Sequence, residues 1–329
     1  MISRLQKRWE NKPSCFSPLT GCSFIYEKFV LLRRSLYQKN FFKIKNFPVP
    51  IIIIGNLTTG GTGKTPMTAW LVNWLKSLGY NPGLVSRGYG GKSKKWPQPV
   101  FADSDPNLVG DEPVMLVKQT GSPMWVGPNR VKAVKSLLVN HACDIIVSDD
   151  GLQHYALGRQ LEIVMVDGEL GFGNEYCLPA GPLREPLSKL KEVDFLISTN
   201  RLLEEAWEIS YKTGNIYNLN NPNLILLPSA LQNKKVHAVA GIGNPKRFFN
   251  QLAELNIIFE PHIFPDHHRY CLQDLSFAKE AVVIMTEKDA VKCCQFNQPN
   301  YWCLQLIPKL DATLVEELEN RITEIMATY

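Results

Sequence analysis

The sequence lacks the signs of a secreted, membrane-spanning or disordered protein. Its eight cysteines form no CxxC pair, and a chain of 329 residues does not need disulfides to hold its core. No apolar run approaches the roughly 18 residues of a spanning helix, and the N-terminus has no signal-peptide pattern. With 22 Gly and 22 Pro, the composition is neither collagen-like nor of low complexity. We therefore expect a folded protein that lies in the cytosol or on the cytosolic side of a membrane.

Acidic residues are scarce at the N-terminus. Residues 1–50 contain ten Lys and Arg but two Glu, whereas the rest of the chain has 26 basic and 29 acidic residues. This asymmetry predicts an anionic partner, either a membrane surface or a nucleic acid. Within residues 23–39, apolar side chains flanked by Lys28, Arg33 and Arg34 recur at helical spacing: Ile25, Phe29, Leu32 and Leu36. Such a helix can lie in an anionic bilayer surface or dock on the protein core, and the pattern leaves both open.

Beyond residue 50, short apolar runs alternate with helical patterns. Buried strands are predicted at 51–55, 83–86, 124–126, 144–148, 161–166 and 194–198. An amphipathic helix is predicted over 65–78, between the first two of them. Strand, helix and strand in this order form a βαβ unit, which predicts an α/β fold with a mostly parallel sheet.

The strongest chemical signal is a Gly-rich loop between the first strand and its helix. The loop consists of Thr58, Thr59, Gly60, Gly61, Thr62, Gly63, Lys64 and Thr65. Its end matches the nucleotide-binding P-loop, in which backbone N–H groups face the phosphates, the Lys reaches the β and γ oxygens and the Thr binds Mg²⁺. The general pattern has Gly where this chain has Thr58. We predict a nucleoside triphosphate site.

P-loop proteins place an acidic residue at the end of a nearby strand, where it holds the metal ion or its water. Asp149 and Asp150 directly follow one predicted strand, and Asp167 follows another. We prefer Asp149 and Asp150, because two adjacent carboxylates precede the segment 151–154, whereas Asp167 is typical of the start of a turn.

A second group of strands is predicted at 236–240, 257–264 and 281–286, after a turn-rich segment at 217–227. The sequence therefore predicts a P-loop kinase-like domain joined by an extended two-segment linker to a smaller α/β C-terminal domain. The predicted boundaries are 1–45 for a basic membrane-contact segment, 46–220 for the nucleotide-binding domain, 221–310 for the smaller domain with linker strands, and 311–329 for a C-terminal helix.

Several segments beyond the loop carry a resemblance to a known family. They are 55–56, 86–91, 110–113, 149–154, 178–186, 266–268 and 286–290. In order and spacing, the chain from about residue 1 to its C-terminus resembles tetraacyldisaccharide 4′-kinase, the lipid A 4′-kinase of Gram-negative bacteria. Thr58 fits this resemblance, since the family departs from the general P-loop pattern at the same place.

The resemblance implies transfer of the γ-phosphoryl group of ATP, with Mg²⁺, to the 4′-hydroxyl of a tetraacyldisaccharide 1-phosphate, which gives the 1,4′-bisphosphate precursor of lipid A. It also implies a peripheral position on the cytoplasmic face of the bacterial inner membrane. The lipid substrate is itself anionic, so the resemblance favours membrane contact by the basic N-terminal helix. We expect neither a nucleic acid nor an obligate protein partner.

The resemblance also implies catalytic roles. Lys64 contacts the phosphates, and Asp111 paired with His267 accepts the proton of the hydroxyl, because a carboxylate orients an imidazole and raises its basicity. Arg184, which follows a Pro/Gly-rich loop that ends near the expected site, is predicted to stabilise the transferring phosphoryl group. From the residues alone, Asp111 is equally typical of a helix N-cap, and which histidine of 267 and 268 takes the role stays open.

The remaining site residues are expected around these groups. Thr65, Asp149, Asp150 and Glu185 are candidate Mg²⁺ ligands, although Arg184 and Glu185 are also typical of an exposed ion pair. Candidate substrate contacts are Arg87, Tyr89, Gln153 and His154, the first two because they follow the C-terminal end of a strand.

Other functions fit the sequence less well. A partitioning or chaperone-like P-loop ATPase acting with a protein partner is the main alternative, but such proteins carry a signature Lys where this chain has Thr59. A nucleic-acid-binding protein is disfavoured because no RRM, KH or helix-turn-helix signature accompanies the basic N-terminus. The group His262, His267, His268 and Cys271 has no standard zinc spacing, and we expect no structural zinc from it.

Overall fold

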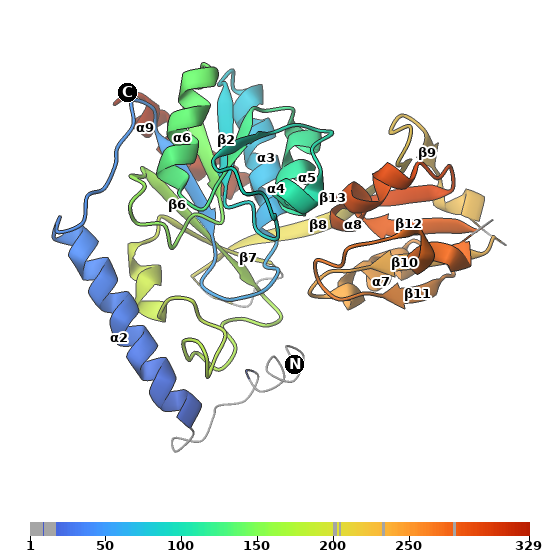
Figure 1. Ribbon diagram of the computed structural model, residues 1–329, viewed down its shortest axis with the longest axis horizontal. Helices are drawn as coiled ribbons and strands as arrows, with labels where there is room; N and C mark the ends of the chain where they lie inside the picture. Colours follow the sequence, from blue (N-terminus) through green and yellow to red (C-terminus); the bar gives the residue numbers. More distant parts are fainter. Residues whose placement is uncertain (1–8, 10–17, 200–202, 204, 232–233, 279–280) are drawn as a thin grey trace.

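A computed structural model of the chain describes residues 9, 18–199, 203, 205–231, 234–278 and 281–329 (Figure 1). Parallel strands form the centre of the larger part of the molecule, which comprises residues 18–199 and the C-terminal helix at 312–326. In order across the sheet they are β7 (Phe195–Thr199), β6 (Leu161–Asp167), β1 (Ile51–Gly55), β5 (Ile145–Asp149), β2 (Pro82–Ser86) and β4 (Met124–Val126). The short β3 (Gln98–Val100) closes this edge, antiparallel to β4. The strands predicted in this region are confirmed, with ends that agree to within one residue.

Helices cover both faces of these strands, which explains the continuous apolar runs. Along β1, Ile52 and Ile54 pack into one core cluster, and Ile51 and Ile53 pack into another on the opposite face. The first cluster lies under α3 (Lys64–Ser77), α4 (Pro106–Val109), α5 (Asp111–Thr120) and α9 (Ala312–Met326). The second lies under α6 (Arg130–Asn140) and the 3₁₀ helix η1 (Leu187–Glu192). The predicted α/β fold is therefore confirmed.

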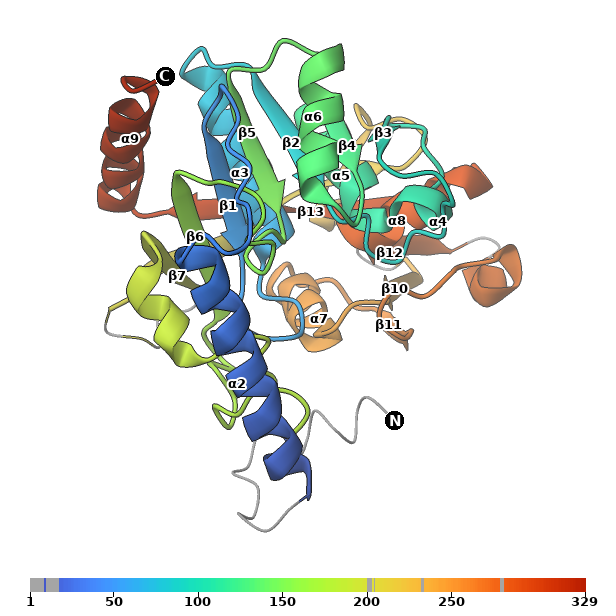
Figure 2. The ribbon, with the colours of Figure 1, turned by 60° about the vertical axis from the view of Figure 1, so that its left-hand side comes forward.

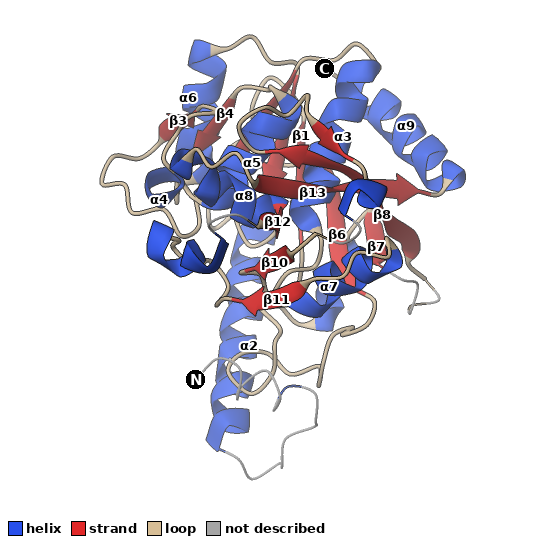
Figure 3. Cartoon of the chain, turned by 90° about the vertical axis from the view of Figure 1, so that its right-hand side faces the viewer, coloured by secondary structure: helices blue, strands red, loops and turns tan. Residues whose placement is uncertain are grey.

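The smaller part continues the same sheet. Its strands are β10 (Val236–Ala240), β11 (Glu260–Ile263) and β12 (Val282–Thr286), with β11 at the edge of the sheet (Figure 3). Its helices are α7 (Pro245–Glu254), α8 (Glu287–Cys293) and the 3₁₀ segments η2 (Pro228–Leu231), η3 (Leu272–Ala278) and η4 (Cys294–Phe296). The strand predicted at 257–264 is shorter than expected, because Asn256 adopts a left-handed conformation and the N–H of Ile257 still bonds to the carbonyl of Leu252 in α7.

Two long strands connect the parts. β8 (Trp207–Asn218) and β13 (Tyr301–Leu310) run antiparallel to each other, from the pair Trp302–Asn218 to the pair Leu310–Ile209 (Figure 1). The short β9 (Ile225–Leu226) pairs with β8. After β13 the chain returns to the larger part, where α9 packs beside β7 and its neighbours (Figure 2).

The long helix α2 (Pro18–Gln38) lies on the outer flank of the larger part (Figures 1 and 2). Ser23 and Val30 are buried, whereas Ile25, Phe29 and Leu32 are 70%, 63% and 58% exposed. The predicted apolar stripe therefore faces away from the core. Among the described helices, none is long and apolar enough to cross a membrane.

Candidate active site

The Gly-rich loop leaves β1 and delivers the N-terminus of α3 to one end of the sheet. Gly60 and Gly63 have φ angles of 123° and 80°, which residues with a side chain rarely adopt. Gly63 is also tightly packed, because its carbonyl accepts a 3.0 Å hydrogen bond from Tyr211 Oη on β8. Lys64 is the first residue of α3. The loop thus presents backbone N–H groups and a helix N-terminus, the arrangement that binds phosphates.

The two adjacent aspartates at the end of β5 have different surroundings. Asp149 is buried, and its Oδ1 accepts a 2.9 Å hydrogen bond from Thr68 Oγ1. Burial, with the negative charge of Glu112 nearby, raises the pKa of Asp149 to about 7. Asp150 receives two hydrogen bonds from Arg184, of 2.9 and 3.1 Å, and lies 3.8 Å from Lys64 Nζ.

The cations around Asp150 keep it ionised. Burial acts to raise the pKa of Asp150, but the charges of Lys64 and Arg184 outweigh it and lower that pKa to about 2. Arg184 also donates to the carbonyl of Asn56 at 3.1 Å, which ties it to the start of the Gly-rich loop. The structure therefore brings together Lys64, Asp150 and Arg184.

Asp111 and His267 come from the two parts of the molecule and meet. Asp111 is the first residue of α5 and is 5% exposed, and its Oδ2 lies 3.1 Å from His267 Nδ1. Burial acts to raise the pKa of Asp111, but the hydrogen bond from His267 and the neighbouring lysines lower it. The same hydrogen bond raises the pKa of His267. His268 instead contacts Asp274, at 3.1 Å, so His267 is the histidine that pairs with Asp111.

The loop after β2 lies against this pair. The ring of Tyr89 is 5.2 Å from that of His267. The N-cap of α5 is Gly110 and not Asp111. With a φ of 98°, Gly110 lies so close to the Tyr89 carbonyl that a Cβ atom there would be 2.6 Å from it. Asp111 is therefore free of the capping role, and its carboxylate is available to His267.

Sequence reasoning missed two lysines and a glutamate beside the pair. Lys288 Nζ lies 3.2 Å from each of three groups, His267 Nε2, Asp266 Oδ1 and Glu112 Oε1. Burial acts to lower the pKa of Lys288, but the surrounding carboxylates raise it above its ordinary value. Glu112 lies in the family segment at 110–113 and Lys288 in that at 286–290. Both residues could therefore have been singled out from the sequence, although no role was predicted for them.

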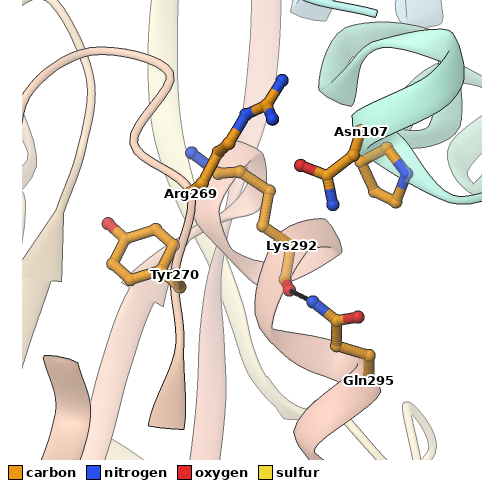
Figure 4. A pocket seen from close by; sticks show the side chains of 6 residues that line it. Asn107, Arg269, Tyr270, Lys292 and Gln295 are labelled. Atoms are coloured by element: carbon orange, nitrogen blue, oxygen red, sulfur yellow. Dashed lines mark hydrogen bonds between the residues drawn. The ribbon is translucent and has the colours of Figure 1, made fainter. Parts of the chain in front are cut away.

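Lys292, the second of these lysines, lines a narrow cleft near Asp111. Lys292 Nζ is 2.9 Å from Asp289 Oδ1 and 4.0 Å from Asp111 Oδ2. The cleft lies between α4 and α8 (Figure 4), and its lining also includes Asn107, Arg269 and Tyr270. It is thus a second place where the two parts of the molecule meet.

Arg130 is a further residue without a sequence signal. It opens α6, is buried, and donates to the backbone carbonyl of Asp150 at 3.1 Å. Burial lowers the pKa of Arg130 to about 10, and the positive charge of Arg87 contributes to this shift. Arg87 itself is exposed at the end of β2. Positive charge is thus concentrated around the end of β5.

Comparison with known proteins identifies the family of the chain. A family model described as tetraacyldisaccharide-1-P 4′-kinase matches residues 16–323. The chain belongs to this family. It is 46% identical over 307 residues to a tetraacyldisaccharide 4′-kinase of Nitrosococcus oceani, covering 93% of this chain and 90% of that protein. A relative of the same name from Methylobacillus flagellatus is 44% identical over 324 residues, covering 98% and 96%.

A solved structure of the 4′-kinase family is also similar. The crystal structure of LpxK from Aquifex aeolicus in complex with ATP superposes with a TM-score of 0.77 at 29% sequence identity. The match covers 93% of this chain and 98% of that one. The agreement extends over both parts of the molecule, so the 4′-kinase fold includes the smaller part and not the P-loop part alone.

Some residues expected from the 4′-kinase resemblance lie apart from the others. Glu185 is buried, and its carboxylate accepts a hydrogen bond from the Tyr155 hydroxyl. Burial raises the pKa of Glu185. Among the contacts of the described residues, none joins Glu185 to Thr65, Asp149 or Asp150. In this structure Glu185 lies in a buried cluster with Tyr155 and Lys189.

Gln153 and His154 lie between these two regions. Gln153 Nε2 donates to the carbonyl of Asn56 at 3.1 Å, and the backbone carbonyl of Gln153 accepts from Arg33 of α2 at 3.3 Å. Burial, with the charge of nearby Arg130, lowers the pKa of His154 to about 4. Gln153 thus links the start of the Gly-rich loop to the N-terminal helix.

Proposed function

We propose that this chain transfers the γ-phosphoryl group of ATP to the 4′-hydroxyl of tetraacyldisaccharide 1-phosphate, which forms the 1,4′-bisphosphate precursor of lipid A. The observation that carries the proposal is the contact between Asp111 and His267 in a chain that has a Gly-rich loop and belongs to the 4′-kinase family. Phosphoryl transfer requires positioning, charge neutralisation and a proton acceptor, and this site supplies groups for each.

Binding of ATP is assigned to the Gly-rich loop. Its backbone N–H groups and the N-terminus of α3 suit the phosphates, and the ammonium of Lys64 suits the β and γ oxygens. Arg184 supports the same function, because its planar guanidinium is held by Asp150 and Asn56 at the end of the sheet. A positioned guanidinium stabilises charge on a phosphoryl group as it is transferred.

The residues at the end of β5 fit a Mg²⁺ ion. Burial and the negative charge of Glu112 raise the pKa of Asp149, and a divalent cation beside these carboxylates would offset both effects. The carboxylates of Asp149, Asp150 and Glu112 and the hydroxyl of Thr65 would supply oxygen ligands of the kind that Mg²⁺ prefers. When bound, the ion neutralises charge on the phosphates.

Asp111 and His267 are assigned to the proton of the acceptor hydroxyl. The Asp111 carboxylate accepts a hydrogen bond from His267 Nδ1, which leaves the Nε2 lone pair available. In this structure Lys288 Nζ lies 3.2 Å from Nε2, so the substrate hydroxyl and Lys288 share the space in front of that atom. Tyr89, exposed beside His267, suits contact with the sugar.

The helix α2 is assigned to the membrane surface, which implies a peripheral position on the cytoplasmic face of the bacterial inner membrane. Exposed Phe29 and Ile25 lie on a helix with exposed Lys28, and the next segment adds exposed Phe41 and Lys43. Apolar side chains beside lysines are typical of helices in an anionic bilayer surface.

Transfer of label from γ-labelled ATP to the tetraacyldisaccharide 1-phosphate in detergent micelles tests the proposed reaction. We expect label in the lipid with Mg²⁺ and none with a chelator. ATP hydrolysis at one rate with and without lipid would instead indicate an ATPase that acts with another partner.

A flotation assay with anionic vesicles that contain no substrate tests the membrane contact separately. The Ile25→Ser, Phe29→Ser double variant should lose flotation, and Val139→Ser, which changes an exposed apolar residue on α6, should keep it. Equal flotation of both variants would contradict the membrane role of α2.

A further inference from the structure

A second group of chemically reactive side chains lies at the sheet edge formed by β10 and β11. His237 lies on β10, and Glu260 and His262 lie on β11, where Glu260 is the register partner of His237. Because side chains alternate along a strand, Glu260 and His262 project on the same face as His237. The nitrogen and oxygen atoms that these three residues offer all lie within 4.8 Å of one another.

The position of the Glu260 carboxylate suggests a shared ligand, because it faces the nitrogen atoms of both histidines. His237 Nδ1 lies 2.8 Å from His262 Nε2, a distance that a hydrogen bond between the rings explains. The Glu260 side chain is 56% exposed and could extend into water, yet its two oxygens approach one ring nitrogen each, at 3.5 and 3.8 Å. Two imidazole nitrogens and a carboxylate therefore converge on one point.

The two rings are held in place by their surroundings. His237 is 1% exposed, and the ring of Phe277 stacks on His262 with centroids 3.7 Å apart and planes 4° apart. Phe277 also contacts the ring of His237, at 4.9 Å. Burial lowers the pKa of both histidines, and the neutral imidazole is the form that binds metals. Ligands fixed in this way lose little freedom when an ion binds.

We propose that His237, Glu260 and His262 form a binding site for a divalent transition-metal ion of the Zn²⁺ type. Two imidazoles and one carboxylate are a ligand set that suits zinc, whereas Mg²⁺ prefers oxygen ligands alone. The exposed side of Glu260 leaves room for water as a fourth ligand. Lys235 is the cation that acts against binding, and the Glu260 carboxylate offsets its charge.

The ion would add to the pairing with β10 that holds β11 at the edge of the sheet. Three of the four residues of β11 are exposed, and Pro261 has no N–H to donate to a neighbouring strand. β10, in contrast, is buried along its whole length. A metal shared by both strands ties β11 to the core, and the chain that leaves β11 reaches His267 four residues later. The ion therefore stabilises the segment that carries the histidine paired with Asp111.

Spacing along the chain does not reveal this site. His237 is 25 residues from His262, and a carboxylate completes the set, so no zinc motif is present. The set of residues from which no structural zinc was expected is a different one: His262, His267, His268 and Cys271. His268 and Cys271 both contact Asp274 instead. Pairing of β10 with β11 alone brings the proposed ligands together.

Binding of Co²⁺, a spectroscopic substitute for Zn²⁺, tests the site in the full chain after treatment with a chelator. We expect one equivalent of Co²⁺ to give the visible absorption of a tetrahedral site, and Zn²⁺ but not Mg²⁺ to displace it. Glu260→Gln and His262→Gln should weaken binding more than the roughly 10- to 100-fold effect of changes outside the ligand shell. His141→Gln and Cys271→Ser, which alter exposed residues elsewhere, should bind like the parent chain.

Thermal unfolding gives a second, independent measurement. Zn²⁺ should raise the unfolding midpoint of the parent chain and of both control variants but not that of Glu260→Gln. A circular dichroism spectrum like that of the parent would show that Glu260→Gln folds normally. Absence of Co²⁺ binding to the parent chain, or equal Co²⁺ binding and Zn²⁺ stabilisation in Glu260→Gln and His262→Gln, would overturn the proposal. Neither result bears on kinase activity with Mg²⁺.

Discussion

The contact between Asp111 and His267 predicts that the two residues act as one catalytic unit. The Asp111 side chain is 6% exposed, and its Oδ2 lies 3.1 Å from His267 Nδ1, so the carboxylate fixes both the orientation and the tautomer of the ring. A positioned proton acceptor contributes about 10²- to 10⁴-fold to a rate, or about 3–5 kcal/mol of activation free energy. Asp111→Asn and His267→Asn should each lower kcat by that factor.

The double variant distinguishes a unit from two independent groups. If the residues act together, Asp111→Asn combined with His267→Asn should lower kcat about as far as either change alone. Independent groups would multiply to a loss of about 10⁴- to 10⁸-fold, because free energies of uncoupled sites add.

Steady-state transfer of label to the lipid, with ATP and lipid both saturating, measures the effect. ATP affinity, measured separately, should change little, since Asp111 and His267 lie outside the Gly-rich loop. His268→Asn is the matched control, because its ring contacts Asp274 instead, and it should keep most of the activity. Multiplicative losses, or near-normal kcat in either single variant, would refute the reasoning.

Three further predictions concern other parts of the chain. Arg184→Lys cannot keep both hydrogen bonds to Asp150 and should lower kcat by about 10²- to 10³-fold, as measured by the same transfer assay. Gly63→Ala should weaken ATP binding at least about tenfold in equilibrium titration. A residue with a Cβ atom is strained at the φ of 80° found at Gly63, and that Cβ would lie 2.5 Å from Tyr211 Oη. Tyr211→Phe should have a smaller effect. Burial raises the pKa of Glu287 from its ordinary value of 4.5 to about 7. The folded state therefore binds the proton of this carboxyl group more tightly than the unfolded chain does. As a result, the free energy of unfolding should fall by about 3 kcal/mol as pH rises from 4.5 to 7. The free energy of unfolding, measured with denaturant at pH 5 and at pH 8, should fall in the parent chain and not in Glu287→Gln. An equal fall in both chains would contradict this prediction.

The strands and helices of the larger part could be predicted from the sequence because each depends on local order. The run of isoleucines at 51–54 is apolar at every position, as a strand covered on both faces requires, and the pattern of α3 repeats at helical spacing. The Gly-rich loop could be predicted for the same reason, since its glycines, Lys64 and Thr65 are consecutive. The family segments then placed Asp111 and His267 in one site.

Other features could not be predicted, because they depend on residues that are distant in sequence. The apolar stripe of α2 was compatible with burial or exposure, and only the fold turns Ile25 and Phe29 outward while Arg33 contacts the carbonyl of Gln153. Nothing in the sequence indicated that Glu185, a candidate metal ligand, contacts the hydroxyl of Tyr155.

By itself, the sequence determined the α/β fold, the nucleotide loop and the family, because these depend on periodicity and on motifs of adjacent residues. The tertiary structure decided which histidine meets Asp111, that Lys288 and Glu112 join them, and that His237 lies beside His262. The physical reason is that each of these contacts joins separate elements. Strand pairing and the approach of the two parts of the molecule set such distances, and spacing along the chain does not.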